Sequence, residues 1–200
     1  PPSLPPLDIP SLLCYNEVMN IQKYQVFCDL DCVLVDLYRG VENEIRKTDS
    51  NNPAHIELGS EKITDAHLSK SNPSYKPAVH SFFRSVLYGN RKFWMNLPWM
   101  EQGKELWELI RHLDPIILSK PTDLDSVIGK KVWLKRNLNL PSDRVLIRRN
   151  KSNYASFEDK CGLLIDDYEA NVTAFRKAGG KAILYKDIGD AIRGLKEYGL

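Results

Sequence analysis

The sequence has no long apolar run and almost no net charge. No stretch approaches the roughly 20 apolar residues that a bilayer-spanning helix needs, so we expect no membrane segment and no membrane partner. The 28 Lys and Arg residues nearly balance the 26 Asp and Glu residues, leaving a formal charge of +2. Such a balance creates no overall attraction for nucleic acid, so a nucleic-acid partner is not favoured.

Cysteine and histidine are too few and too scattered to form a disulfide framework or a zinc site. The four cysteines contain no C-x-x-C pair, and two of them stand in runs typical of buried strands. The four histidines lack the spacing of metal ligands. The proline-rich start lacks the charged and apolar regions of a signal peptide. Together these features predict a soluble, cytoplasmic protein.

Short apolar runs alternate with amphipathic stretches through most of the chain. They predict strands at 24–29, 114–119, 144–149, 162–165 and 181–185, and helices at 103–113, 125–137, 168–178 and 187–197. This alternation indicates an α/β fold, a Rossmann-like three-layer sandwich whose mostly parallel sheet is covered on both faces. In such folds a ligand binds at the carboxyl ends of the strands.

Two segments fall outside this alternation. Residues 1–22 are predicted to form an arm on the surface, because five prolines fall within residues 1–12. Residues 37–99 are far longer than one crossover requires, so we expect a small helical cap inserted after the first strand. Residues 23–36 and 100–200 would then make up the core.

The first chemical signal is a pair of carboxylates where the first strand ends. Asp29 and Asp31 are separated by one residue, and the same pattern also occurs in ordinary acidic turns. Buried carboxylates this close together favour a cation between them, and hard oxygen ligands suit Mg²⁺. A carboxylate is already ionised at neutral pH, so Asp29 is a candidate nucleophile toward phosphorus. Asp31 is then the candidate acid and base for the leaving group and for water.

A second acidic pair follows a later apolar strand. Asp166 and Asp167 come directly after Leu163, Leu164 and Ile165. If this strand lies beside the first, the pair would join Asp29 in an oxygen cage for one Mg²⁺. A helix N-cap would use the same residues, and the two roles are compatible.

Polar residues at two other strand ends are candidates for binding phosphate. Ser119 and Lys120 end the strand at 114–119, and Lys151 follows the strand at 144–149. Lys130 and Lys131 are alternatives to Lys151 within a basic stretch that spans 128–151. That stretch predicts a local positive field for an anionic substrate, or a solvated helix face.

The predicted cap ends in an aromatic cluster. Phe93 and Trp94 are candidates for stacking on a nucleobase, and the same rings also suit helix packing.

The order of these motifs resembles that of the haloacid dehalogenase-like hydrolase superfamily over residues 22–190. Within it, the residues around Asp29, the Ser119-Lys120 step and the run ending at Asp167 are similar to the 5'(3')-deoxyribonucleotidase branch and to related phage and bacterial phosphatases. The resemblance implies Asp29 as nucleophile, Asp31 as acid and base, and Ser119 and Lys151 as phosphate ligands. It also implies Mg²⁺ held by Asp29, the Asp31 carbonyl and the pair Asp166 and Asp167. The chain departs from the family at Cys32, where a glycine is usual.

The function predicted from these residues is Mg²⁺-dependent phosphomonoester hydrolysis through an aspartyl-phosphate. The expected substrate is a small phosphorylated molecule, with a nucleotide favoured. A nucleic-acid end or a phosphosugar remains an alternative substrate. A binding module of the same fold, without catalysis, is the alternative from another class, for which Cys32 would mark a decayed site.

Overall fold

The computed structural model describes residues 23–200. The arm predicted at residues 1–22 lies outside the described residues. Across the described part of the chain, every helix is too short or too polar to cross a membrane.

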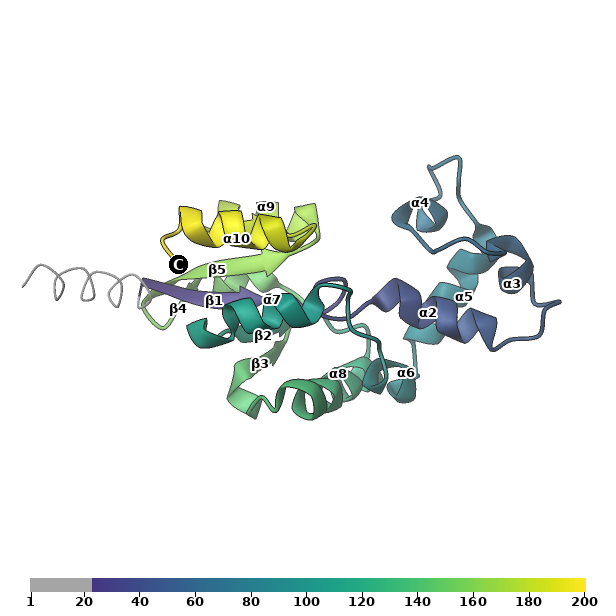
Figure 1. The fold of residues 1–200 in the computed structure, drawn as a ribbon, viewed down its shortest axis with the longest axis horizontal. Helices are drawn as coiled ribbons and strands as arrows, with labels where there is room; N and C mark the ends of the chain where they lie inside the picture. Colours follow the sequence, from purple (N-terminus) through teal and green to yellow (C-terminus); the bar gives the residue numbers. More distant parts are fainter. Residues whose placement is uncertain (1–22) are drawn as a thin grey trace, which may run out of the picture.

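A six-stranded, mainly parallel sheet forms the core (Figure 1). Its strands are β1 (Tyr24–Cys28), β2 (Ile116–Ser119), β3 (Val145–Ile147), β4 (Ser156–Phe157), β5 (Lys160–Asp166) and β6 (Lys181–Leu184). The order runs β3, β2, β1, β5, and the far edge of β5 pairs with β4 at its start and with β6 further along. β1 therefore lies between β2 and β5, with parallel pairing on both sides.

The five predicted strands are all present, and no strand end differs from the prediction by more than two residues. β4 was not predicted. It folds back antiparallel on the start of β5 through Glu158 and Asp159, whose φ angles are 47° and 62°.

Helices cover both faces of the sheet because the central strands are apolar on both. Successive strand residues point to opposite faces, so Phe27 packs with Phe175 of α9 in one apolar cluster, while Cys28 belongs to the other. The second cluster includes residues of α7, α8 and α10. The three-layer α/β arrangement expected from the sequence is confirmed. The helices are α7 (Gly103–Ile110), α8 (Leu124–Leu138), α9 (Glu169–Lys177) and α10 (Ile188–Glu197), with short 3-10 turns η1 (Arg111–Leu113), η2 (Ser142–Arg144) and η3 (Lys151–Tyr154).

The residues of the predicted cap form helices that gather beyond the carboxyl end of β1 (Figure 1). They are α2 (Leu37–Arg46), α3 (Pro53–Leu58), α4 (Asp65–Leu68), α5 (Pro77–Leu87) and α6 (Arg91–Met95). The two connections to the core are hydrogen-bonded to each other. The Asp36 N–H donates to the Pro98 carbonyl, and the Met100 N–H donates to the Leu34 carbonyl, each at 2.9 Å. The boundaries between a core of residues 23–36 and 100–200 and a cap of residues 37–99 remain a prediction.

The last of these helices, α6, packs directly on α8. A Cβ added at Gly129 of α8 would lie 2.4 Å from the Trp94 Cβ, so this approach requires glycine. Trp94 and α6 are thereby fixed against the core.

Candidate active site

Asp29 lies at the carboxyl end of the central strand, and its side chain is almost completely buried. Only 6% of the residue is exposed. Its backbone N–H continues the ladder by donating to the Ile165 carbonyl at 2.9 Å. Its Oδ1 accepts the Leu30 N–H at 2.7 Å and lies 2.7 Å from Lys151 Nζ. The strand, the following turn and a lysine thus fix this carboxylate.

Lys151 joins the two acidic strand ends. It opens η3, directly after β3, and its ammonium lies 2.7 Å from Asp29 Oδ1 and 2.6 Å from Asp166 Oδ2. Burial alone would lower the pKa of Lys151, but the two carboxylates outweigh burial and raise it above its ordinary value. Lys151 therefore carries its charge at neutral pH. The structure selects it, ahead of Lys130 and Lys131, as the lysine beside the candidate nucleophile.

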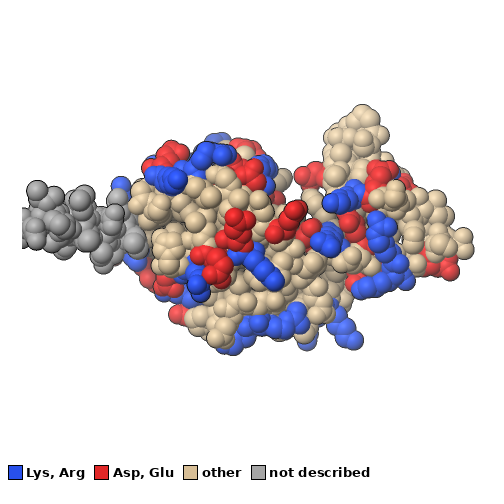
Figure 2. Space-filling view, in the orientation of Figure 1, with Lys and Arg blue, Asp and Glu red and all other residues tan. Residues whose placement is uncertain are grey.

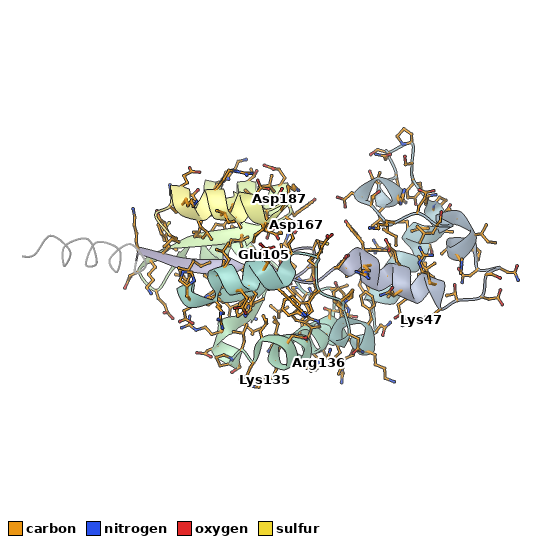
Figure 3. The ribbon with its side chains drawn as sticks, viewed as in Figure 1. Lys47, Glu105, Lys135, Arg136, Asp167 and Asp187 are labelled. Carbon is orange, nitrogen blue, oxygen red and sulfur yellow. The ribbon has the colours of Figure 1, made fainter. Side chains whose placement is uncertain are left out.

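Asp166 and Asp167 complete an acidic cluster at the end of β5. Asp166 is fully buried and accepts bonds from Lys151 and from the Asn171 amide, the latter at 3.0 and 3.1 Å. Oxygen atoms of Asp29, Asp166 and Asp167 all lie within 4.8 Å of one another. Figure 3 labels Asp167 at the end of the sheet that faces α2. The parallel pairing of β1 with β5 is what brings these side chains together.

This cluster carries more negative charge than the protein neutralises. Burial, then the charges of Asp29 and Asp166, raise the pKa of Asp167 to about 7. Burial and Asp29 also raise the pKa of Asp166, against the pull of Lys151. Convergent, hard carboxylate oxygens with unrelieved repulsion are the donor set that Mg²⁺ takes. The residues therefore fit the metal that the sequence predicted.

The repulsion predicts that Asp167→Asn stabilises the metal-free protein. Because the pKa of Asp167 is raised in the fold, its ionised form destabilises the protein fully above pH about 7, and this effect fades as pH falls toward 4. We expect the free energy of unfolding to rise by about 1–3 kcal/mol at pH 8 in EDTA. Urea denaturation at pH 8 and pH 4.5 measures it.

The same variant should respond less than the wild type to added Mg²⁺, because it lacks one of the three carboxylates. A lower stability of Asp167→Asn than of the wild type at pH 8 in EDTA would contradict the repulsion. So would a difference that stays the same at pH 4.5.

Asp31 lies near this cluster but its carboxylate points elsewhere. Its Oδ2 accepts a 2.5 Å bond from Lys130 Nζ, and its side chain is 23% exposed. Burial raises the pKa of Asp31 although Lys130 opposes the shift. A carboxyl group with a raised pKa suits alternate donation and acceptance of a proton.

Ser119 and Lys120 lie at the same edge of the sheet, as expected. Ser119 is fully buried at the end of β2, and its Oγ lies 3.1 Å from Lys130 Nζ. Lys120 donates to Asn171 Oδ1 at 2.6 Å, and Asn171 in turn bonds Asp166. Both residues therefore border the acidic cluster.

Phe93 and Trp94 do not fit the predicted role in stacking on a nucleobase. Phe93 is 6% exposed and Trp94 is 1% exposed, and the rings meet edge to face with their centroids 5.3 Å apart. Trp94 Nε1 donates to the Leu87 carbonyl at 3.0 Å. The alternative, helix packing, describes both side chains, because Trp94 packs at Gly129 of α8 and the Phe93 ring lies close to Gly40 of α2.

The basic stretch at 128–151 mostly faces away from the site. Lys135 and Arg136 project from α8 on the flank opposite Asp167 (Figure 3). Lys135 bonds Asn139 at 2.7 Å, near the end of its own helix. Only the two buried lysines of the stretch within the described chain, Lys130 and Lys151, reach the carboxylates. These two charges are the part of the basic stretch that contributes directly to the field at the carboxylates.

Cys32 occupies a left-handed backbone position in the turn after Asp31. Its φ is 59°, a conformation that glycine adopts most readily. The turn closes with the Cys32 N–H donating to the Val35 carbonyl at 2.7 Å. Burial, followed by the charges of Asp167 and Asp31, raises the pKa of the Cys32 thiol, so it stays protonated. The site geometry is formed with cysteine in place of glycine.

Comparison with known proteins supports this architecture. No protein-family model and no curated protein matches the chain. A solved hydrolase from Streptococcus pneumoniae TIGR4 superposes with a TM-score of 0.55, covering 87% of this chain and 99% of its own, at 16% sequence identity. The chain has the fold of that hydrolase.

Two further solved structures superpose less well. One is a dehalogenase, with a TM-score of 0.44 and 11% identity over 80% of this chain and 83% of its own. The other is a haloacid dehalogenase-like family hydrolase from Streptococcus pneumoniae, with a TM-score of 0.43 and 16% identity over 84% and 89%. At these identities the likeness concerns the fold alone, so the chemistry has to be argued from this chain's own residues.

Sequence reasoning missed two contributors to the site. Asn171 gave no signal, because an asparagine in the first turns of a helix is common. Lys130 was considered only as a substitute for Lys151, whereas the structure buries both lysines beside different carboxylates.

Proposed function

We propose that this chain is a Mg²⁺-dependent phosphomonoester hydrolase that works through an aspartyl-phosphate on Asp29. The observation that carries the proposal is the convergence of Asp29, Lys151, Asp166 and Asp167 at the carboxyl end of the central strand. A structural role alone does not account for it, because three buried carboxylates repel one another and one lysine cannot neutralise them.

In the first step, an Asp29 carboxylate oxygen attacks phosphorus and the bond from phosphorus to the leaving oxygen breaks. Lys151 and Ser119, which follow or end the neighbouring strands β3 and β2, would bind the phosphate oxygens. Lys151 also holds the Asp29 carboxylate in place through its 2.7 Å contact. Fixing the nucleophile before the substrate binds removes an entropic part of the barrier.

Asp31 supplies the protons. It gives a proton to the departing alkoxide, and it then takes a proton from the water that attacks the aspartyl-phosphate. The bond between phosphorus and Asp29 breaks in this second step, releasing phosphate and restoring the carboxylate. One residue can serve twice because its pKa is raised by burial.

Asp29, Asp166 and Asp167 would hold Mg²⁺, with the Asp31 carbonyl as a further oxygen ligand. When bound, Mg²⁺ would neutralise phosphate charge.

A nucleotide is the proposed substrate. A cavity of about 640 Å³ lies between the start of α2 and the linker at Met100, with Tyr38, Arg39 and Lys62 in its lining. Figure 2 shows the molecule hollowed between the part that carries the sheet and the part that carries α2 to α5. Tyr38 lies in the first turn of α2, and its side chain is only partly buried at the lining of this cavity. In place of the buried Phe93 and Trp94, Tyr38 is the aromatic ring that we propose for contact with a base.

A substrate panel tests the proposal. We expect the wild type to hydrolyse deoxyribonucleoside monophosphates faster than phosphosugars, with turnover lost in EDTA and restored by Mg²⁺. Phosphate release is the measurement, and 5'-phosphorylated oligonucleotides test the nucleic-acid alternative. Preference for phosphosugars would overturn the nucleotide assignment alone. Absence of turnover on every ester, by folded protein with Mg²⁺ present, would favour the binding module.

A further inference from the structure

Lys130 is the second buried lysine of the site, and it has no role in the formation or the hydrolysis of the aspartyl-phosphate as proposed. It lies on α8 and has no exposed surface. Its ammonium bonds Asp31 Oδ2 at 2.5 Å, the Lys120 carbonyl at 2.6 Å and Ser119 Oγ at 3.1 Å. The candidate acid and base is therefore joined to the candidate phosphate ligand on β2 by one side chain.

The ammonium of Lys130 has no donor left for a substrate. A lysine has three N–H donors, and all three point at protein acceptors. The Trp94 ring lies 4.7 Å away from Nζ, in cation–π contact. Lys130 is thus unlike Lys151, whose side-chain partners among residues 23–200 are the nucleophile and a cluster carboxylate. A fully bonded ammonium fits a role in holding its neighbours better than a role in binding phosphate.

Asp31 depends on Lys130 for its position. Its other oxygen, Oδ1, is buried and has no hydrogen-bond partner among the described residues. The bond to Lys130 is therefore the one polar contact that the described structure gives this carboxylate. Without it, nothing polar would keep the group in its rotamer.

We propose that Lys130 is a positioning residue that holds Asp31 ready for proton transfer to the leaving group. The inference rests on the proposed phosphomonoesterase function. It implies that Lys130 matters for esters whose alkoxide needs a proton and matters little for esters whose leaving group departs as a stable anion. Trp94 and Gly129 anchor α8 so that Lys130 reaches the site from a fixed helix.

The leaving group provides the test. The experiment compares Lys130→Met with the wild type on thymidine 5'-monophosphate, or the best alkyl phosphate of the panel, and on 2,4-dinitrophenyl phosphate. The value of kcat/KM reports the steps through release of the leaving group. We expect a loss of about 100-fold or more on the alkyl ester, the usual size of a general-acid contribution, and less than about tenfold on the aryl ester.

Two control variants carry the same change from lysine to methionine at other positions. Lys131→Met alters the next residue of α8, which is exposed, and should change neither value. Lys151→Met removes a contact to the nucleophile and should lower both values together. If Lys130 acts only through Asp31, then Lys130→Met added to Asp31→Asn should leave the activity of Asp31→Asn unchanged.

The outcomes separate the two proposals. Equal losses on both esters, or no loss on either, overturn the role of Lys130 and leave the phosphatase intact. A wild type inactive on both esters overturns the phosphatase and the inference with it. Should Lys130→Met fail to fold, Lys130→Gln repeats the comparison on the two esters with an amide that can still donate to the Asp31 carboxylate. The double variant Asp31→Asn with Lys130→Met, which has no buried carboxylate at this position, is compared with Asp31→Asn alone.

Discussion

Replacing Asp29 with Asn should abolish Mg²⁺-dependent turnover, lowering kcat by on the order of 10⁴-fold or more, as removal of a covalent nucleophile does. Asparagine has nearly the same shape, but its amide is neutral and is not a nucleophile toward phosphorus. The protein should also fold at least as well, because one of three mutually repelling carboxylates is gone. Phosphate release and thermal unfolding measure the two effects.

A matched control is Asp114→Asn. Asp114 is largely exposed, with its side chain 69% accessible, and its partner is Arg144, away from the cluster. The control should keep wild-type kcat. Acid-quenched wild type should carry a phosphoryl label from a labelled substrate, and Asp29→Asn should carry none. If Asp29→Asn kept more than about a tenth of the activity, the covalent mechanism would be wrong.

The positions of the catalytic candidates were predictable because each follows an apolar strand. In a parallel sheet all strands end at one edge, so Asp29, Ser119, Lys151 and Asp166 had to meet once the strands were recognised. Spacing along the chain was less informative. The segment between Lys151 and Asp166, for example, includes the hairpin formed by β4 and the start of β5, which the pattern does not indicate.

The hairpin was missed because its turn lacks the usual residues. Turns with positive φ at both central positions favour Asn-Gly or Asp-Gly. Here Glu158 and Asp159 take those angles, so no glycine marked the reversal.

The sequence also did not show which residues of a helix point toward the core. Lys130 and Lys131 are neighbours in a basic run, and the sequence makes them equal candidates for the lysine that binds phosphate. The structure buries the first completely and exposes the second, because α6 packs on α8 at Gly129 and turns that face inward. The same packing buries Trp94, and Phe93 is buried beside it, although the sequence pattern leaves both rings open to base stacking.

The balance of charges at the site indicates how much Lys151 contributes to the stability of the acidic cluster. The carboxylates of Asp29, Asp166 and Asp167 converge on the site and that of Asp31 lies nearby, and the lysines paired with these four groups are Lys130 and Lys151. One divalent cation would bring the total to neutrality. Lys130 is engaged with Asp31, so Lys151 is the cation that offsets the remaining carboxylates in the metal-free protein.

Replacing Lys151 with Met should therefore cause the largest loss of stability of any single change at the site. It leaves Asp29 and Asp166 buried without their shared cation, and breaking a buried ion pair costs about 3–5 kcal/mol. The pKa of Lys151 is raised, so its contribution is fully present at neutral pH and is lost only as pH rises through that raised value. Urea denaturation at pH 7 in EDTA measures the loss.

Adding Asp166→Asn to Lys151→Met should return part of that stability, since the double variant removes one of the two carboxylates left unpaired. Mg²⁺ should stabilise Lys151→Met when all three ligands are kept, because the ion takes over the neutralising charge of the lysine. Lys181→Met, at an exposed position of β6, is the matched control and should unfold like the wild type. A stability of Lys151→Met within about 1 kcal/mol of the wild type in EDTA would show that water already solvates the cluster, because solvated ion pairs contribute no more than that. The raised pKa of Asp167 would then lose its physical cause, and with it the argument that this edge of the sheet is built for a divalent cation.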